Sequence, residues 1–303
     1  MDNDKKFLHY NGQRIAYSQY GNAAAPALVL LMGLGLPGQV WPMSLLSHLL
    51  QEGFQIIVPD NRDCGDSFRF PAEKALTEKE IGKAIVRALA FLPVTGHYAL
   101  EDMALDVEKL LNELEIRRAH VVGISMGGMI AQVLATQCPN RVASLVSIAS
   151  ASGNPRTGLG NLKAIQALIS RPKEKTPEAV RAYFENVFNT LAGPDFKPEA
   201  DEMYRLLEEV GRIHYDAEGA YRQLLAILMS GNRAKQLRRL HVPTLVIHGT
   251  DDPLLPYAAG EEVAELIPGA RLESIKGMGH QLPEKLMPRI GKLIARHCHA
   301  NPA

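Results

Sequence analysis

The chain has 303 residues, is 46% hydrophobic and balances 33 lysines and arginines against 33 aspartates and glutamates. This is the composition of a globular protein with one large core or two smaller ones. A net charge of zero gives no electrostatic reason to bind nucleic acid or an anionic membrane, so we expect a small neutral partner. The three cysteines are widely separated, which excludes C-x-x-C metal and redox motifs and argues against a disulfide framework.

The amino-terminal residues are polar and lack the apolar segment of a secretory signal. The longest apolar stretch, 27–36, is interrupted by Gly33 and Gly35 and is too short to span a bilayer. We therefore expect a cytoplasmic protein that does not enter a membrane. The sequence leaves a homodimer open.

Short apolar, β-branched segments alternate with helical patterns along most of the chain. The spacing predicts strands at 27–32, 54–58, 119–124, 144–148, 244–248 and 271–275. It predicts helices between most of them, at 41–51, 100–113, 126–137, 258–266 and 283–297. Strands that are apolar throughout are typical of a parallel sheet covered on both faces, so the fold class is α/β. Asn11-Gly12 predicts a hairpin over 7–20 that adds antiparallel strands at one edge.

Two segments break this alternation. Residues 153–235 show helical patterns and no strand, which predicts a helical cap (lid) domain between two parts of an α/β core, 1–152 and 236–303. The second segment, residues 70–97, is predicted to be a further helical insertion in the core, because Thr77 to Glu80 match the capping box that begins a helix.

The helix after this capping box has one apolar face, formed by Ile81, Ile85, Leu89 and Leu92. The preceding loop is expected at the carboxyl edge of the sheet, where α/β folds build their sites. We therefore expect this face to pack against the cap and to narrow the entrance to the site. The alternative is an ordinary surface helix on the core.

A candidate nucleophile follows the strand at 119–124. The run from Gly123 to Gly128 places G-x-S-x-G on the turn from this strand into an apolar helix. A serine on such a turn is exposed at the edge of the sheet, and glycines flank it because side chains there would clash with the adjacent strand and helix. Ser125 is therefore the expected nucleophile, and it needs a base and an orienting carboxylate downstream.

Both partners are available after later strands. The strand at 244–248 is followed by Asp251 and Asp252, and the last strand is followed by His280 in a glycine-flanked loop. The order serine, aspartate, histidine is the one expected for a triad in this architecture. His248 lies inside a predicted strand and is expected to be structural.

These motifs together resemble the α/β-hydrolase superfamily of serine hydrolases, over residues 1–152 and 236–303. The segments that carry the resemblance are Met32 to Gly35, Asp60 to Ser67, Gly123 to Gly128, Gly249 to Pro253 and Gly277 to Pro283. More narrowly, the sequences around Ser125 and His280 are similar to those of aclacinomycin methylesterase-like carboxylesterases. The resemblance implies the α/β-hydrolase fold, a mostly parallel sheet flanked by helices with an inserted helical cap.

The resemblance also implies roles for individual residues. It assigns Asp252 to the triad and makes Asp251 a turn-stabilising neighbour. It places the oxyanion hole at the backbone N–H groups of Leu34 and Met126. The glycines that support these turns are Gly33, Gly123 and Gly127.

The loop after the second long strand departs from the family pattern. It carries Asp63-Cys64 where relatives often have glycine, which leaves Cys64 as a minor alternative nucleophile, although no histidine is visible to pair with it. Arg62 in the same loop is expected either to brace the oxyanion loop by hydrogen bonds or to form a surface ion pair.

The implied activity is hydrolysis of carboxylic esters of small to medium, mostly apolar compounds through an acyl-enzyme, with no metal or organic cofactor. Alternatives on the same triad are carbon–carbon bond hydrolysis, prolyl aminopeptidase-like cleavage and perhydrolysis. Outside enzymes, the alternative is a ligand receptor on a hydrolase fold, which turnover of p-nitrophenyl esters would discriminate.

Overall fold

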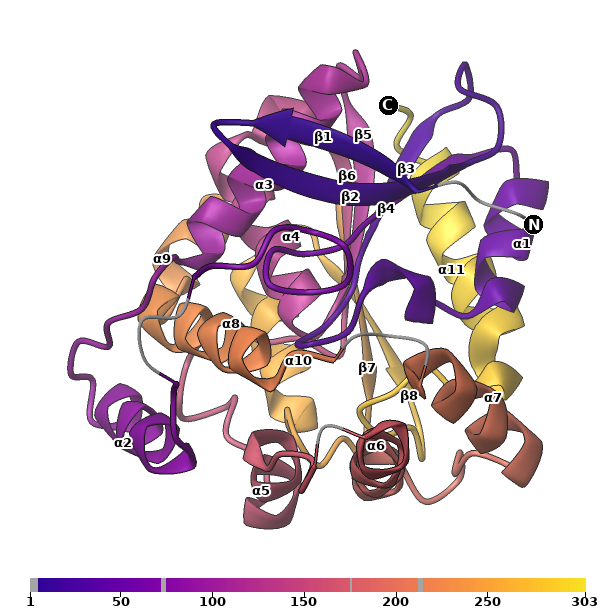
Figure 1. Ribbon diagram of the computed structural model, residues 1–303. Helices are drawn as coiled ribbons and strands as arrows, with labels where there is room; N and C mark the ends of the chain where they lie inside the picture. The colour runs from indigo at the N-terminus through magenta and orange to yellow at the C-terminus, as the bar shows by residue number, and fades with distance from the viewer. Residues whose placement is uncertain (1–4, 72–74, 175, 212–214) are drawn as a thin grey trace.

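One sheet of eight strands runs through the computed structural model, which describes residues 5–71, 75–174, 176–211 and 215–303 (Figure 1). The strands lie in the order β1-β2-β4-β3-β5-β6-β7-β8. Their bounds are Lys6–Tyr10 (β1), Gln13–Tyr20 (β2), Ala27–Leu31 (β3), Gln55–Pro59 (β4), Ala119–Ile124 (β5), Val142–Ile148 (β6), Thr244–Gly249 (β7) and Arg271–Ile275 (β8). The predicted strands are thus confirmed with small shifts at their ends.

From β4 onward in the spatial order, neighbouring strands pair in parallel, whereas β1 and β2 form an antiparallel hairpin at one edge. The hairpin turns at Asn11 and Gly12, whose φ angles of 47° and 74° suit a tight turn that follows the twist of the sheet. The central strands β3, β5 and β6 are buried along their whole length. Such strands need cover on both faces, which explains their unbroken apolar sequences.

Helices cover the two faces of the sheet. On one face lie α1 (Met43–Gln51) and α11 (Met287–His299), whose apolar side chains join the core formed with β3 and β4. On the other lie α3 (Leu100–Glu113), α4 (Met126–Gln137) and α10 (Tyr257–Leu266). All five correspond to helices predicted from the sequence. The sheet and these helices form a three-layer core.

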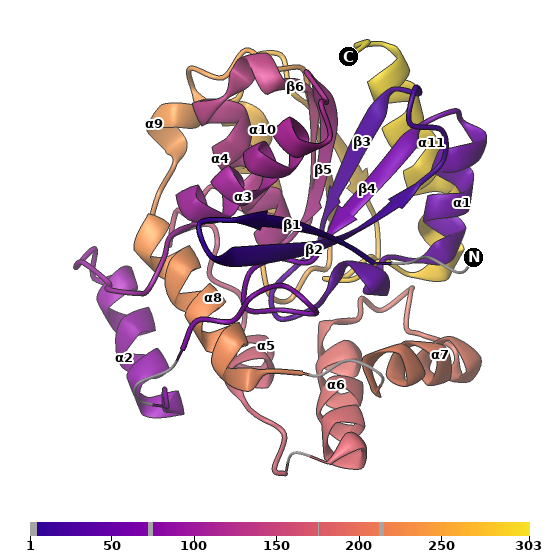
Figure 2. The ribbon, with the colours of Figure 1, turned by 45° about the horizontal axis from the view of Figure 1, so that its top comes forward.

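The described chain between β6 and β7 contains helices and no strand, as predicted. These helices are α5 (Leu162–Ile169), α6 (Pro177–Leu191), α7 (Ala200–Gly211), α8 (Ala217–Ser230) and the short α9 (Ala234–Leu237). We call residues 153–235 the insert. Figures 1 and 2 show α5, α6 and α7 beyond the end of the sheet at which the parallel strands finish. These three helices of the insert therefore lie at the edge where an α/β site is expected.

Helix α2 (Glu78–Leu89) begins at the predicted capping box, in which Thr77 and Glu80 each accept from the other's backbone N–H. It packs against α8, as Figure 2 also shows, through Ile81 and Ala84, which are buried. The prediction that the whole apolar face is buried is wrong for its second half, because Leu89 and Leu92 are 37% and 51% exposed. The helix ends at Leu89, so the helical period that placed Leu92 on this face does not continue that far.

Candidate active site

Ser125 lies on a sharp turn between β5 and α4. Its φ of 53° falls in the left-handed region that residues other than glycine seldom adopt, a strain often found at functional sites. A Cβ on Gly123 would lie 2.1 Å from the carbonyl oxygen of Gly127, and one on Gly127 would lie 2.0 Å from that of Leu31. The turn therefore requires glycine at both positions, which is the physical reason for the motif.

Three residues from distant parts of the sequence meet at this turn. The Nε2 atom of His280 lies 2.9 Å from Ser125 Oγ, and its Nδ1 atom lies 2.7 Å from Asp252 Oδ2. A carboxylate can only accept, so Nδ1 carries a proton that it donates to Asp252. In the neutral ring Nε2 is then the acceptor for the Ser125 hydroxyl, which is the arrangement that general-base activation of serine needs.

Asp252 is held from a second side as well. Its Oδ1 atom accepts hydrogen bonds of 2.9 Å from the amides of Leu254 and Leu255. Burial acts to raise the pKa of Asp252, but the charge of His280 and hydrogen bonds from His248 and His280 outweigh it and hold this pKa well below its usual range. The carboxylate is therefore kept ionised. His248, expected to be structural, contributes to this environment with its Nε2 3.5 Å from Asp252 Oδ2.

Asp251, the neighbouring carboxylate, is bonded to other groups than the histidine. It is exposed, and its Oδ2 atom accepts from the Thr250 hydroxyl at 2.5 Å and from the Gly277 amide at 3.0 Å. These contacts join the loops after β7 and β8. The side chain therefore stabilises a turn, as expected, and lies outside the hydrogen-bonded triad.

The loop after β3 passes directly over Ser125. A Cβ on Gly33 would lie 3.4 Å from Ser125 Cβ, and the next residue, Leu34, lines the same cavity as the serine. Met126 is the first residue of α4, where a backbone N–H has no partner within the helix. The loop is braced by Asn61, whose Nδ2 donates to the Met32 carbonyl at 3.0 Å. Sequence reasoning missed the role of Asn61, and its place two residues after β4 was the available signal.

Arg62 takes neither of the two roles expected for it. Its guanidinium is buried and donates twice to Asp106 of α3 at 2.7 Å, and once to the Asp102 carbonyl at 2.9 Å. The ion pair is internal, and it lies against the rings of Phe68 and Tyr98. The side chain therefore joins the loop after β4 to α3, and among the described residues its hydrogen bonds go to α3 rather than to the oxyanion loop.

Cys64, the alternative nucleophile, is buried in the loop after β4. Burial is the main cause that raises the pKa of this thiol above its usual value, and the charge of Asp60 adds to it. A thiol that stays protonated is a poor nucleophile, so the geometry favours Ser125.

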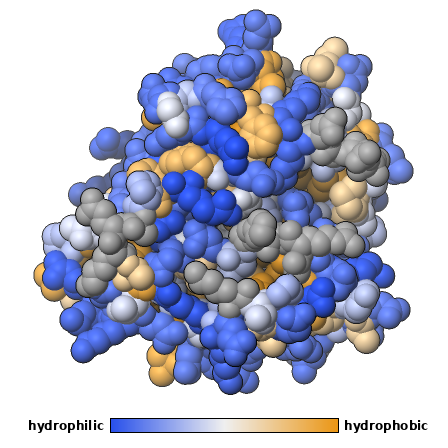
Figure 3. Space-filling model, in the orientation of Figure 1, coloured by the Kyte–Doolittle hydropathy of each residue, from blue (hydrophilic) through white to orange (hydrophobic). Residues whose placement is uncertain are grey.

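Ser125 and His280 open into a cavity of about 290 Å³. More than half of the residues that line it belong to the insert, and most of these are apolar, among them Ile165, Tyr183, Phe184, Val187, Phe188, Leu224 and Leu228. Ile85 of α2 also lines it. In contrast, the outer surface in Figure 3 is mostly hydrophilic, with small separate apolar areas. The cavity can therefore hold an apolar group beside the serine while excluding much of the water.

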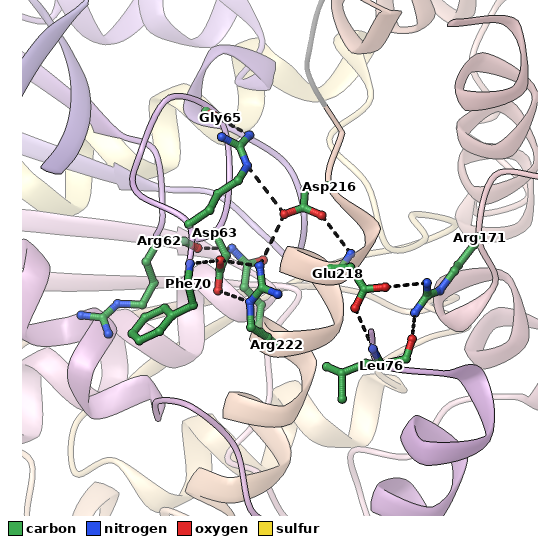
Figure 4. A network of polar contacts seen from close by, with 11 residues as sticks. Arg62, Asp63, Gly65, Phe70, Leu76, Arg171, Asp216, Glu218 and Arg222 are labelled. Atoms are coloured by element: carbon green, nitrogen blue, oxygen red, sulfur yellow. Dashed lines mark hydrogen bonds and ion pairs between the residues drawn. The ribbon is translucent and has the colours of Figure 1, made fainter. Parts of the chain in front are cut away.

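The insert is bonded to the loop that carries His280 and to the loop after β4. The Leu191 carbonyl, at the end of α6, accepts from the His280 amide at 2.8 Å, and Gly193 packs so closely that a Cβ would lie 2.1 Å from the Gly277 carbonyl oxygen. On the other side, Arg222 of α8 donates to both carboxylate oxygens of Asp63, at 2.9 and 2.7 Å (Figure 4). No sequence pattern pointed to these contacts.

Within the four described ranges, no group of three or more His, Cys, Asp or Glu side chains is arranged to hold a metal ion. Among the helices described, none is both long enough and apolar enough to cross a membrane.

Comparison with known proteins adds independent information. A protein family described as alpha/beta hydrolase fold matches residues 26–284. Rhodomycin D methylesterase of Streptomyces peucetius is 27% identical over 92% of this chain and 93% of its own. 3-Oxoadipate enol-lactonase 2 of Acinetobacter baylyi is 27% identical over 86% of this chain and 84% of its own. Among solved structures, the enol-lactonase from Burkholderia xenovorans superposes with a TM-score of 0.70 at 22% identity, covering 96% of this chain and 99% of its own, which shows a common fold.

Proposed function

The chain belongs to the α/β-hydrolase fold family, and on that premise we propose that it is a serine esterase that cleaves carboxylic esters of small to medium, mostly apolar compounds. The observation that carries the proposal is the hydrogen-bonded chain from Ser125 through His280 to Asp252, open to an apolar cavity. The two curated relatives described above, a methylesterase and an enol-lactonase, support an ester or lactone as the bond attacked.

In the proposed reaction, His280 Nε2 accepts the Ser125 proton while the serine oxygen attacks the ester carbonyl carbon. Asp252 holds the ring in the tautomer that leaves Nε2 free to accept, and it stabilises the imidazolium that forms. His280 then gives the proton to the leaving alcohol, and an acyl-enzyme on Ser125 results. Water, deprotonated by the same nitrogen, releases the acid and restores the serine.

The tetrahedral intermediate carries a negative oxygen that needs donors. We assign these to the backbone N–H groups of Leu34 and Met126, which come from the two sides of Ser125. Losing one such donor typically costs about 3 kcal/mol of barrier, so the loop that carries Leu34 must be rigid. Met126 gains its position from α4, whose amino-terminal dipole also favours the negative charge.

We assign the insert the role of a cap. Its apolar side chains line the cavity, so a bound acyl or alcohol group would exchange water for hydrocarbon contacts, at about 25 cal/mol per Å² of apolar surface buried. The partner proposed for the chain is accordingly a small-molecule ester.

The test is Ser125→Ala, compared with Ser18→Ala in β2 as a matched control outside the site. Hydrolysis of p-nitrophenyl butyrate should fall by at least about 10⁴-fold in the first variant, with unchanged melting temperature, and should be unchanged in the second. A fluorophosphonate should label the wild type and not the Ser125→Ala protein. Turnover that survives in pure Ser125→Ala protein would overturn the mechanism.

A further inference from the structure

A buried glutamine of the insert touches two loops of the core at once. Gln223 of α8 has no exposed surface. Its Oε1 atom accepts from the Gly35 amide at 2.7 Å, and its Nε2 atom donates to the Arg62 carbonyl at 2.7 Å. One amide thus joins the loop after β3 to the loop after β4.

The first of these loops is the one that carries the oxyanion donor. Gly35 follows Leu34 directly, and its φ of 69° is a conformation that glycine adopts without strain. A Cβ on Gly35 would lie 3.2 Å from Ala220 Cβ of α8, so the loop is pressed against the helix. The bond from Gly35 to Gln223 therefore fixes the peptide that follows Leu34 and limits rotation at Leu34 itself.

Helix α8, which carries Gln223, is itself fixed to the core by other buried contacts. Arg222, next to Gln223, pairs with both oxygens of Asp63, and these two side chains are 3% and 0% exposed. Asp63 also accepts from the Phe70 amide at 2.9 Å, and Figure 4 shows how these groups converge on the start of α8. A Cβ on Gly219 would lie 2.3 Å from the Asp63 carbonyl oxygen. The helix cannot shift without breaking a buried, bidentate ion pair.

We propose that Gln223 is a positioning residue for the oxyanion site. Through its bond to Gly35, Gln223 holds the Leu34 N–H in line with the developing negative charge. This inference rests on the proposed esterase function. The glutamine touches no substrate in this scheme. It acts on the loop, so its loss should raise the energy of the transition state without weakening the binding of the ground-state ester.

The experiment is Gln223→Met, which keeps the length of the side chain and removes both hydrogen bonds. We expect kcat to fall by about 10- to 100-fold, less than the loss on deleting an oxyanion donor outright, with KM changed by less than about twofold. A trifluoromethyl ketone forms an adduct with Ser125 that carries the same oxyanion. Its inhibition constant should rise by the same factor by which kcat/KM falls.

The matched control is Gln132→Met. Gln132 is equally buried, lies in α4, and donates to Ser147 Oγ at 3.2 Å, away from the oxyanion loop. This variant can lose stability but should keep kcat and the inhibition constant. If Gln223→Met does not fold, Gln223→Asn replaces it, because an amide one methylene shorter cannot reach both partners.

The outcomes separate the two proposals. A folded Gln223 variant with wild-type kcat and inhibition constant, or with a change in KM alone, overturns the positioning role. A wild-type protein that neither hydrolyses esters nor reacts with a fluorophosphonate overturns the esterase function instead.

Discussion

At the scale of single residues, the site depends on two adjacent carboxylates that differ only in what surrounds them. Asp252 is buried and bonded to His280, whereas Asp251 is exposed and bonded to a turn. The proton that His280 donates to Asp252 fixes the tautomer on which general-base catalysis depends. The chemistry is thus set by the direction of one loop after β7.

We predict that Asp252→Asn lowers kcat by about 10³- to 10⁴-fold, because an asparagine amide favours the wrong histidine tautomer. Asp251→Asn should lower kcat by less than about threefold, since this side chain is outside the triad. Steady-state kinetics with p-nitrophenyl butyrate measures both variants. A larger loss in Asp251→Asn than in Asp252→Asn would show that the triad assignment is wrong by one residue.

The sequence pointed to Ser125, Asp252 and His280 because each sits in a local motif at the end of a strand, and these three residues are hydrogen-bonded to one another in the structure. It did not identify Asn61, Gln223 or the true partner of Arg62. Each of these side chains pairs with a backbone group or carboxylate that is distant in sequence, and neither spacing nor composition encodes such a partner. The pairing of β3 with β4 brings Asn61 to Met32, and the packing of α3 and α8 against the core brings the other groups together.

At the scale of elements, the apolar periods predicted nearly every strand and core helix, since burial on a sheet imposes a strong pattern. The same reasoning was less successful for α2. Its contact with α8 covers only part of the helix, so apolar residues such as Leu89 remain exposed although they fit the period. An amphipathic pattern indicates which face of a helix is buried. It does not indicate how far along the helix the element packed against that face extends.

This difference along α2 gives a test with an internal control. Ile85 lines the cavity, whereas Leu89, one turn later, is exposed. Ile85→Ala should enlarge the cavity and raise the ratio of kcat/KM for p-nitrophenyl octanoate to that for p-nitrophenyl acetate by about 3- to 10-fold. Leu89→Ala should leave this ratio unchanged. Equal ratios in both variants would mean that α2 does not shape the substrate site.

At the scale of the whole molecule, a histidine in the middle of the sheet links stability to pH. His120 in β5 is buried and lies with Nδ1 2.9 Å from Ser144 Oγ of β6. Burial, together with the charges of His297 and His299, lowers the pKa of His120 from its usual value of 6.5 to about 4. Between these values the unfolded chain binds a proton at His120 that the folded protein does not, so the contribution of this group to folding stability falls as the pH falls.

We predict that this histidine costs about 3 kcal/mol of folding stability between pH 7 and pH 4. Between pH 7 and pH 4, the decrease in the free energy of unfolding should be smaller in His120→Gln than in the wild type, and the difference between the two decreases should be about this amount. His9→Gln, at an exposed position of β1, is the control and should keep the wild-type slope. Urea denaturation at several pH values measures all three proteins. Identical slopes for wild type and His120→Gln would contradict the prediction.

The contacts between the insert and the two catalytic loops limit how this enzyme can be re-engineered. Leu191 holds the backbone of His280, and Gln223 holds the loop of the oxyanion donor. A chimera that replaces residues 153–235 with the corresponding segment of a relative would therefore exchange part of the catalytic framework along with the substrate pocket. Specificity is better transferred by grafting the cavity-facing side chains of α5 and α6 onto the existing backbone. The insert, although contiguous in sequence, is not a modular unit in this protein.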